Sequence, residues 1–108
     1  QKRFLVALWG LESSYGRAAG QRPVIQSLAS LAYRKKRTHY FRKELIEALK
    51  ILDAGHVTLE EMKGSWAGAM GPFQFMPSSY IHYAVDGDGD GRIDIWSSVP
   101  DALASAAN

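Results

Sequence analysis

The stretch DGDGDGRIDIWSSVPD, residues Asp86–Asp101, alternates acidic residues with glycine and predicts a loop that binds a cation. The residues that match positions 1, 3, 5 and 6 of an EF-hand loop are Asp86, Asp88, Asp90 and Gly91, and Arg92 falls at position 7, where the backbone carbonyl is the ligand. Three aspartates this close would repel one another without a cation, so a merely solvated acidic turn is the weaker interpretation. Oxygen ligands in a flexible cage favour calcium over magnesium.

The loop departs from the EF-hand pattern at its end. Position 12 is Ser97 rather than the usual bidentate glutamate, and the next acid, Asp101, comes four residues later, just inside the following predicted helix. A longer loop would return the Asp101 carboxylate to the ion and would hold two helices together. Because the sequence contains no second such loop, a structural role is favoured over a sensor role.

Around this loop, apolar periodicity and helix-capping signals predict a mainly α domain. Five helices are expected: residues 2–14, one that starts at Pro23, Thr38 to about Leu52, Pro77 to Val85, and a last one from Pro100. The apolar face of the second helix consists of Val24, Ile25, Leu28 and Leu31. That of the third consists of Phe41, Leu45, Ile46, Leu49 and Leu52, and residues 53–55 close this helix. Thr58 and Glu61 form a capping-box pattern, which predicts another short helix that ends at Gly64. We interpret Glu44, Glu47 and Asp53 as solvated acids.

The segment GSWAGAMGPFQFM, residues 64–76, is too rich in glycine for a regular helix and also contains a proline. We expect loops with a small β-hairpin, which would form the irregular wall of a cleft. Neutral hydrogen-bonding side chains in and after this segment (Ser65, Gln74, Ser78, Ser79) are interleaved with aromatic ones (Trp66, Phe73, Phe75, Tyr80). This combination suits a sugar, whose hydroxyls need polar partners and whose ring faces are apolar, although an ordinary loop with buried aromatics fits equally well.

Composition limits the classes of function. The 108 residues are 46% hydrophobic and 22% charged, as in an ordinary globular domain, and no apolar run is long enough to span a membrane. The formal net charge of +2 favours anionic partners without selecting nucleic acid. The sequence has no recognisable Ser-His-Asp pattern, and its scattered histidines are interpreted as surface or capping residues.

Glu12 is the carboxylate that the sequence sets apart. It lies in ALWGLESSYGR, residues 7–17, among apolar and aromatic residues and without a neighbouring cation. Such surroundings would desolvate the carboxylate and raise its pKa, so that it keeps a proton near neutral pH, as a general acid for glycoside cleavage requires. From position alone, an exposed glutamate at a helix end remains the alternative.

Three segments in register, WGLESSYGR, GSWAGAMGPFQFMPSSY and YAVDGDGDGRIDIW, resemble the lytic murein transglycosylase B family across nearly the whole chain. The resemblance implies a mainly α, lysozyme-like (α+β) catalytic domain that cleaves the β-1,4 bond between N-acetylmuramic acid (MurNAc) and N-acetylglucosamine (GlcNAc) in peptidoglycan glycan strands. It implies a 1,6-anhydromuramoyl product and a periplasmic or cell-envelope location. We expect residues 1–108 to form a single domain, the core fragment of a larger catalytic domain.

The resemblance also assigns site residues. Glu12 matches the one glutamate that acts first as acid and then as base. Positions that match substrate-binding residues are Ser65, Gln74, Tyr40, Lys36, Arg37 and Asn108, and those of the structural Ca²⁺ site are Asp86, Asp88, Asp90, the Arg92 carbonyl and Asp101. The family's calcium loop is also longer than an EF-hand loop, which accounts for Ser97. No organic cofactor is expected. For Lys36 and Arg37, a solvated helix–helix turn is equally compatible.

Three other functions stay open at this point. A peptidoglycan-binding module would be catalytically silent, although retention of Glu12 with Ser65 and Gln74 argues against it. A calcium-stabilised interaction domain would have no sugar role. A lysozyme-type hydrolase is the nearest chemical rival, and it would leave reducing ends instead of anhydro ends.

Overall fold

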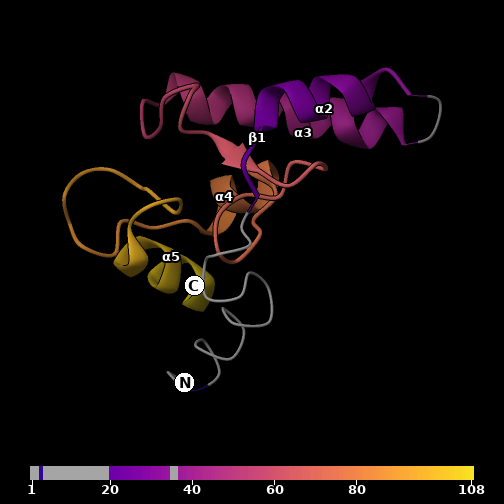
Figure 1. Ribbon diagram of the computed structural model, residues 1–108. Coiled ribbons are helices and arrows are strands. Elements are labelled where there is room, and N and C mark those ends of the chain that lie inside the picture. Colours follow the sequence, from indigo (N-terminus) through magenta and orange to yellow (C-terminus); the bar gives the residue numbers. More distant parts are fainter. Residues whose placement is uncertain (1–2, 4–19, 35–36) are drawn as a thin grey trace.

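The computed structural model describes residues 3, 20–34 and 37–108. Its elements follow the order β1 (Arg22–Pro23), α2 (Val24–Ala32), α3 (Thr38–Asp53), β2 (Lys63–Gly64), α4 (Pro77–Tyr83) and α5 (Val99–Ala107). The mainly α architecture is confirmed (Figure 1). The predicted helix over residues 2–14 lies almost wholly outside the described residues. No helix in the described part of the chain is long and apolar enough to cross a membrane.

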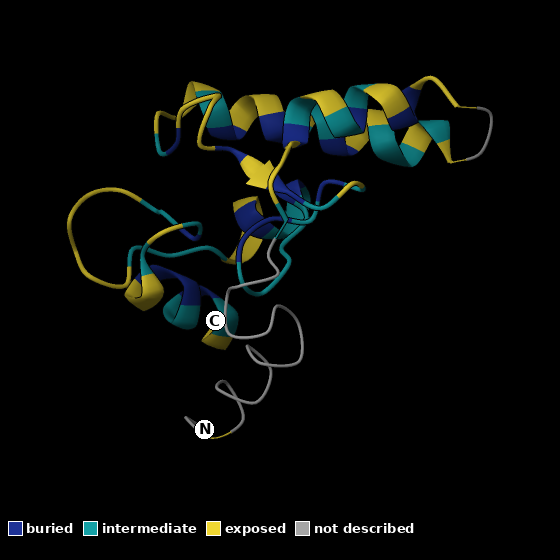
Figure 2. Cartoon of the chain, viewed as in Figure 1, coloured by how far each residue is buried: buried dark blue, intermediate teal, exposed yellow. Residues whose placement is uncertain are grey.

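Helices α2 and α3 lie side by side and run in opposite directions (Figure 1). The α2 face predicted from apolar spacing is confirmed, since Val24 and Leu28 are fully buried. On α3 the predicted face is partly wrong, because Ile46 and Leu49 are about half exposed. The buried row of α3 is Glu44, Ala48 and Ile51, and Figure 2 shows buried positions recurring between exposed ones along both helices.

The sequence predicts Pro23 as the first residue of one helix and Thr38 as the capping residue of the next, and each start differs from this by one residue. Pro23 precedes α2 instead of opening its first turn, because Arg22 and Pro23 pair with Gly64 and Lys63 in a two-stranded antiparallel sheet. Arg37, with a positive φ of 58°, is the residue before α3. Thr38 therefore does not cap the helix, and its hydroxyl donates to the Arg34 carbonyl instead.

The capping box at Thr58 forms, but no helix follows it. The Glu61 amide donates to Thr58 Oγ1 at 3.2 Å, and the Thr58 amide donates to Glu61 Oε1 at 3.2 Å. A single turn results, because fully buried Met62 draws the chain into the core and the next two residues form β2. The helix predicted between Thr58 and Gly64 is therefore wrong.

The segment between β2 and α4 is irregular with small β contacts, as predicted. Isolated antiparallel bridges join Met70 to Gly64 on one side and to Phe75 on the other. Met70 and Phe75 exchange both backbone hydrogen bonds at 2.8 Å. A Cβ atom on Gly64 would lie 2.3 Å from the Ala69 carbonyl oxygen, so the close approach of these backbones requires glycine there.

A buried carboxylate joins α3 to α4. Glu44 is 3% exposed, and its two oxygens accept hydrogen bonds from the Ser78 amide at 2.9 Å and the Ser78 hydroxyl at 2.8 Å. Met76, the residue before α4, offers no capping side chain, so a carboxylate from another helix takes that role at the positive end of the helix dipole. The interpretation of Glu44 as a solvated acid is wrong. Ser78 serves this contact, and Tyr80 is buried.

We expect Glu44→Ala to lower the free energy of unfolding by about 2 kcal/mol, because it leaves the Ser78 donors unpaired in a buried position. Urea unfolding measures this loss. The matched control is Asp53→Ala at an exposed position of the same helix, which should cost under about 0.5 kcal/mol. Equal losses in the two variants would contradict the capping role.

Candidate functional site

The acidic loop gathers four carboxylates around one point. Oxygen atoms of Asp86, Asp88, Asp90 and Asp101 all lie within 4.8 Å of one another. Asp101 is in the first turn of α5, beyond the place where an EF-hand loop ends, and the longer loop brings it back to the other three. An all-oxygen set of this size suits a hard divalent cation of the size of calcium.

Asp101, on α5, holds the loop together. It has no exposed surface, and its carboxylate accepts the Gly87 amide at 2.7 Å, the Asp88 amide at 3.2 Å and the Asp94 amide at 2.8 Å. One side chain on α5 therefore fixes both the start and the far side of the loop. This pattern satisfies a buried charge that would otherwise be costly.

The charges of the cluster are unevenly stabilised. Several backbone amides donate to Asp86 and hold the pKa of this carboxyl below its ordinary value. The Gly91 amide, 2.7 Å from Asp86 Oδ2, has the largest effect. Loss of hydration, and next the Asp86 carboxyl, raises the pKa of Asp88. The backbone thus supports a negative charge at Asp86, whereas loss of hydration and then neighbouring carboxylates oppose one at Asp88. A divalent cation would relieve that repulsion, so these residues fit such an ion.

Two residues outside the loop, His56 and Tyr80, anchor its far end through contacts that the sequence did not reveal. His56 Nδ1 accepts the Ile93 amide at 3.0 Å, and the His56 carbonyl accepts the Arg92 guanidinium at 2.8 Å. The Tyr80 hydroxyl donates to the Ile93 carbonyl at 2.6 Å. Burial, reinforced by Asp94 and Asp101, raises the pKa of Tyr80 far above its ordinary value, so this hydroxyl remains a donor. His56 is half-buried and binds a loop amide instead of capping a helix, which differs from the surface or capping role predicted from the sequence.

Ser65 and Gln74 lie on neighbouring segments of the bridged loop, next to Gly64 and Phe75. Ser65 Oγ accepts the Ala69 amide at 3.1 Å, which leaves its hydrogen available for another group. Gln74 adopts a positive φ of 55°, a conformation that costs a residue with a side chain about 1 kcal/mol. Its Nε2 donates to the Gly71 carbonyl at 3.0 Å. Backbone strain of this kind concentrates at functional sites.

The other predicted site residues do not all come together. The Arg37 guanidinium lies over the Tyr40 ring, 4.3 Å from its centroid, at the start of α3. Asn108 lies at the end of α5 and donates to the Tyr83 carbonyl at 3.1 Å. Figure 1 shows that end of the chain on the far side of α4 from the α2–α3 pair. Glu12 and Lys36 lie outside the described residues.

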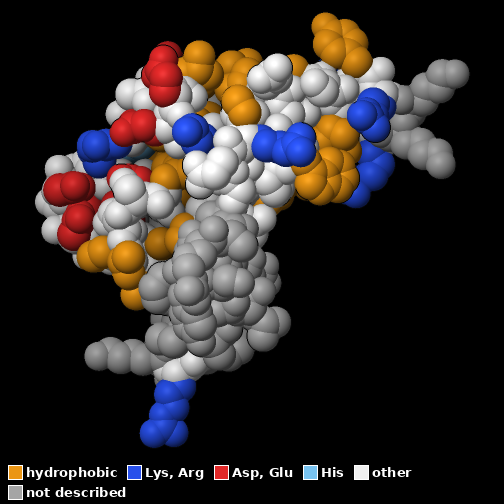
Figure 3. Space-filling model, viewed as in Figure 1, with side chains coloured by type: hydrophobic (Ala, Val, Ile, Leu, Met, Phe, Trp, Pro, Cys, Tyr) orange, Lys and Arg blue, Asp and Glu red, His pale blue; other side chains and the backbone are white. Residues whose placement is uncertain are grey.

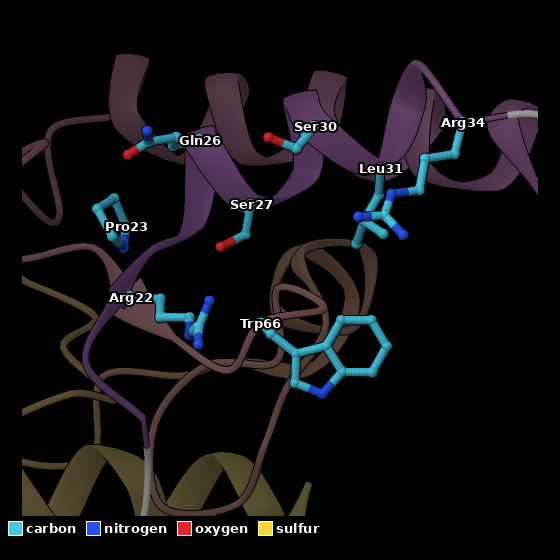
Figure 4. Close-up of a pocket in the computed structure, with 8 residues that line it drawn as sticks. All are labelled: Arg22, Pro23, Gln26, Ser27, Ser30, Leu31, Arg34 and Trp66. Carbon is cyan, nitrogen blue, oxygen red and sulfur yellow. The ribbon is translucent and has the colours of Figure 1, made fainter.

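A pocket that sequence reasoning missed lies between α2 and the loop after β2 (Figure 4). This α2 pocket has a volume of about 370 Å³, and its lining residues are Arg22, Pro23, Gln26, Ser27, Ser30, Leu31, Arg34 and Trp66. Ser27, Ser30 and Arg34 recur at helical spacing, a signal that could have indicated one polar face. Arg22 and Trp66 reach the pocket only through folding.

Comparison with known proteins gives a consistent result. A family model described as a transglycosylase SLT domain matches residues 1–108. Over 105 residues the chain is 43% identical to membrane-bound lytic murein transglycosylase B of Escherichia coli (strain K12), an alignment that covers 96% of this chain and 29% of that protein.

Solved structures agree with this match. The chain is similar to SltB3 from Pseudomonas aeruginosa in complex with NAG-anhNAM-pentapeptide, with a TM-score of 0.93 and 55% identity over 96% of this chain and 28% of that one. It is also similar to E. coli Slt35 in complex with calcium, with a TM-score of 0.89 and 42% identity over 96% of this chain and 33% of that one. The chain thus spans a third or less of the length of these relatives. The three sequence segments and the fold agree with this match, and the chain belongs to the transglycosylase SLT domain family.

Proposed function

We propose that this chain carries the core of a lytic transglycosylase, which cleaves the β-1,4 bond between MurNAc and GlcNAc in peptidoglycan and leaves a 1,6-anhydro end. The observation that carries the proposal is the similarity to SltB3, at 55% identity, because that structure holds a ligand with the anhydro sugar. The curated relative is named membrane-bound, which supports a cell-envelope location.

In the proposed reaction Glu12 is the single acid and base. Its carboxyl group donates a proton to the glycosidic oxygen as the bond from that oxygen to C1 of MurNAc breaks. The C6 hydroxyl of the same sugar then attacks C1 and returns a proton to the carboxylate. The C–O bond between the two sugars breaks and a new C1–O6 bond forms within MurNAc, so no water is consumed and Glu12 ends in its starting state.

Described residues supply the sugar contacts in this proposal. Ser65 keeps a hydroxyl hydrogen to donate, and Gln74 presents an amide from a backbone position held at a positive φ. Arg37 stacked on Tyr40 offers a cation beside an aromatic face, which suits an anionic group on a sugar. Preorganised donors of this kind favour the transition state because they do not reorganise during the reaction.

We expect Glu12→Gln to lower turnover of peptidoglycan by at least roughly a hundredfold, because glutamine cannot transfer the proton. Digestion of peptidoglycan followed by mass spectrometry of the muropeptides measures this, with Glu60→Gln as the matched control on an exposed glutamate. The parent and the control should release anhydro-muropeptides. Products that carry an added water would identify a hydrolase, and a parent that binds but yields no product would identify a binding module.

Substitutions of Gln74 separate the role of its side chain in activity from the effect of its backbone conformation on stability. Gln74→Gly removes the strain at φ 55° but also the hydrogen bond to Gly71, so we expect the free energy of unfolding to change by less than about 1 kcal/mol. We expect kcat/KM to fall about tenfold, because the amide no longer reaches the sugar. If the glycine variant is as active as the parent, Gln74 matters only for the turn. Gln74→Ala, which keeps the strain, should lose stability as well.

We also propose that Asp86, Asp88, Asp90 and Asp101 bind calcium, with the Arg92 carbonyl as a further ligand. The four clustered carboxylates support this site, and Slt35 was solved in complex with calcium. When bound, the ion would neutralise the cluster and secure the loop to α5. Asp101 on α5 accepts amides from the loop itself, at Gly87 and Asp94, which favours a structural role.

Calcium should therefore raise the melting temperature of the parent relative to the protein in a chelator, and magnesium should raise it less. At a calcium concentration about a hundred times Kd, the stabilisation is about 2.7 kcal/mol. Asp90→Asn changes an exposed ligand and should abolish most of this increment. Asp53→Asn, which makes the same charge change at an exposed position on α3, should keep it. An increment that survives in Asp90→Asn would contradict the assigned site.

A further inference from the structure

We propose that the α2 pocket binds the carboxylates of the peptide that a glycan strand carries, so that it serves as a peptide subsite beside the sugar-binding loop. This inference rests on the proposed function, because that function supplies a glycan substrate with an attached acidic peptide. The residues that carry it are Arg22, Arg34 and Trp66, of which only Trp66 belonged to the predicted sugar-binding combination.

The charge of the pocket points to an anionic ligand. Arg22 and Arg34 approach it from its two ends, and none of its eight lining residues is acidic (Figure 4). Among the described residues, the ion pairs are Lys50 with Glu47 and Arg92 with Glu61, so neither guanidinium of the pocket is paired with a carboxylate there. A guanidinium offers two parallel N–H donors that match the two oxygens of a carboxylate.

The neutral part of the pocket suits a peptide on a sugar. Gln26, Ser27 and Ser30 supply polar groups for amides and hydroxyls, and Trp66 is 65% exposed, so its indole face is open to a ligand. A volume of about 370 Å³ lies at the small end of ligand sites, which fits a few peptide residues rather than a glycan strand.

The position of the pocket favours a peptide attached to the glycan over a free one. Trp66 directly follows Ser65, whose hydroxyl is a proposed sugar contact, and the Gly68 amide donates to the Ser65 carbonyl at 3.0 Å to hold this turn. Arg22 pairs with Gly64, the residue on the other side of Ser65. The pocket and the proposed sugar contact are therefore built on the same short segment, within reach of one substrate.

Isothermal titration calorimetry tests the inference on the full-length protein, with probes that stay intact because none contains a bond from C1 of MurNAc to GlcNAc. The probes are GlcNAc-MurNAc-tripeptide, the same compound with its peptide carboxylates amidated, the disaccharide without peptide, and the tripeptide alone. We expect the acid to bind about tenfold more tightly than the amidated compound, and added salt to reduce this preference. The double variant Arg22→Gln/Arg34→Gln should abolish it.

The matched control is Arg42→Gln/Lys43→Gln, which removes two exposed charges from α3 outside the pocket and should keep the tenfold preference. Equal binding of the acid and the amidated compound, or equal loss in both double variants, would overturn the inference. If the free tripeptide binds as tightly as the disaccharide-tripeptide, the claim that the pocket binds a peptide attached to a glycan is overturned. Failure of the proposed function appears separately, as absence of anhydro products from the parent enzyme.

Discussion

The hydrogen bonds from Ser78 to the buried Glu44 carboxylate fix where α4 begins, and the described sites depend on that point. The irregular loop of Ser65 and Gln74 runs from β2 to α4, so its far end is set by the same contact. One turn into α4, the Tyr80 hydroxyl holds the Ile93 carbonyl of the acidic loop. A single buried acid therefore connects the helix pair to both functional segments.

The acidic loop is held at several points by groups outside it. Asp101 of α5 binds its first and later amides, and His56, just after α3, binds Ile93. The four carboxylates are thus positioned by the surrounding fold and not only by the ion they would bind. This arrangement suits a structural site, because a loop anchored on α5, α4 and the end of α3 has little freedom to move on binding.

The features that could be predicted from the sequence are those that depend on local residue patterns. Apolar spacing gave α2 and most of α3, and the family resemblance placed Asp101 with the three loop aspartates. Glu44 was misassigned because its lysine and arginine neighbours suggested solvation, although its place on the helix, four residues before Ala48 and seven before Ile51, puts it on the buried face. The α2 pocket could not be predicted, since it requires the pairing of Arg22 with Gly64, and two-residue strands have no sequence signal.

Acidic and basic side chains of the described residues lie in different parts of the molecule. This distribution relates the proposed calcium ion to the binding of the proposed substrate. Acidic side chains gather around the acidic loop, whereas arginines lie over β1 and near the turn between α2 and α3 (Figure 3). A peptidoglycan strand is anionic, so an uncompensated acidic cluster would oppose its approach, and an ion there adds two positive charges to a formal net charge of +2. Calcium would then act on the substrate through the field of the whole domain, without contacting it. The effect falls off within about a Debye length, roughly 10 Å at 0.1 M salt, so it would modify the rate of encounter more than the chemistry in the cleft.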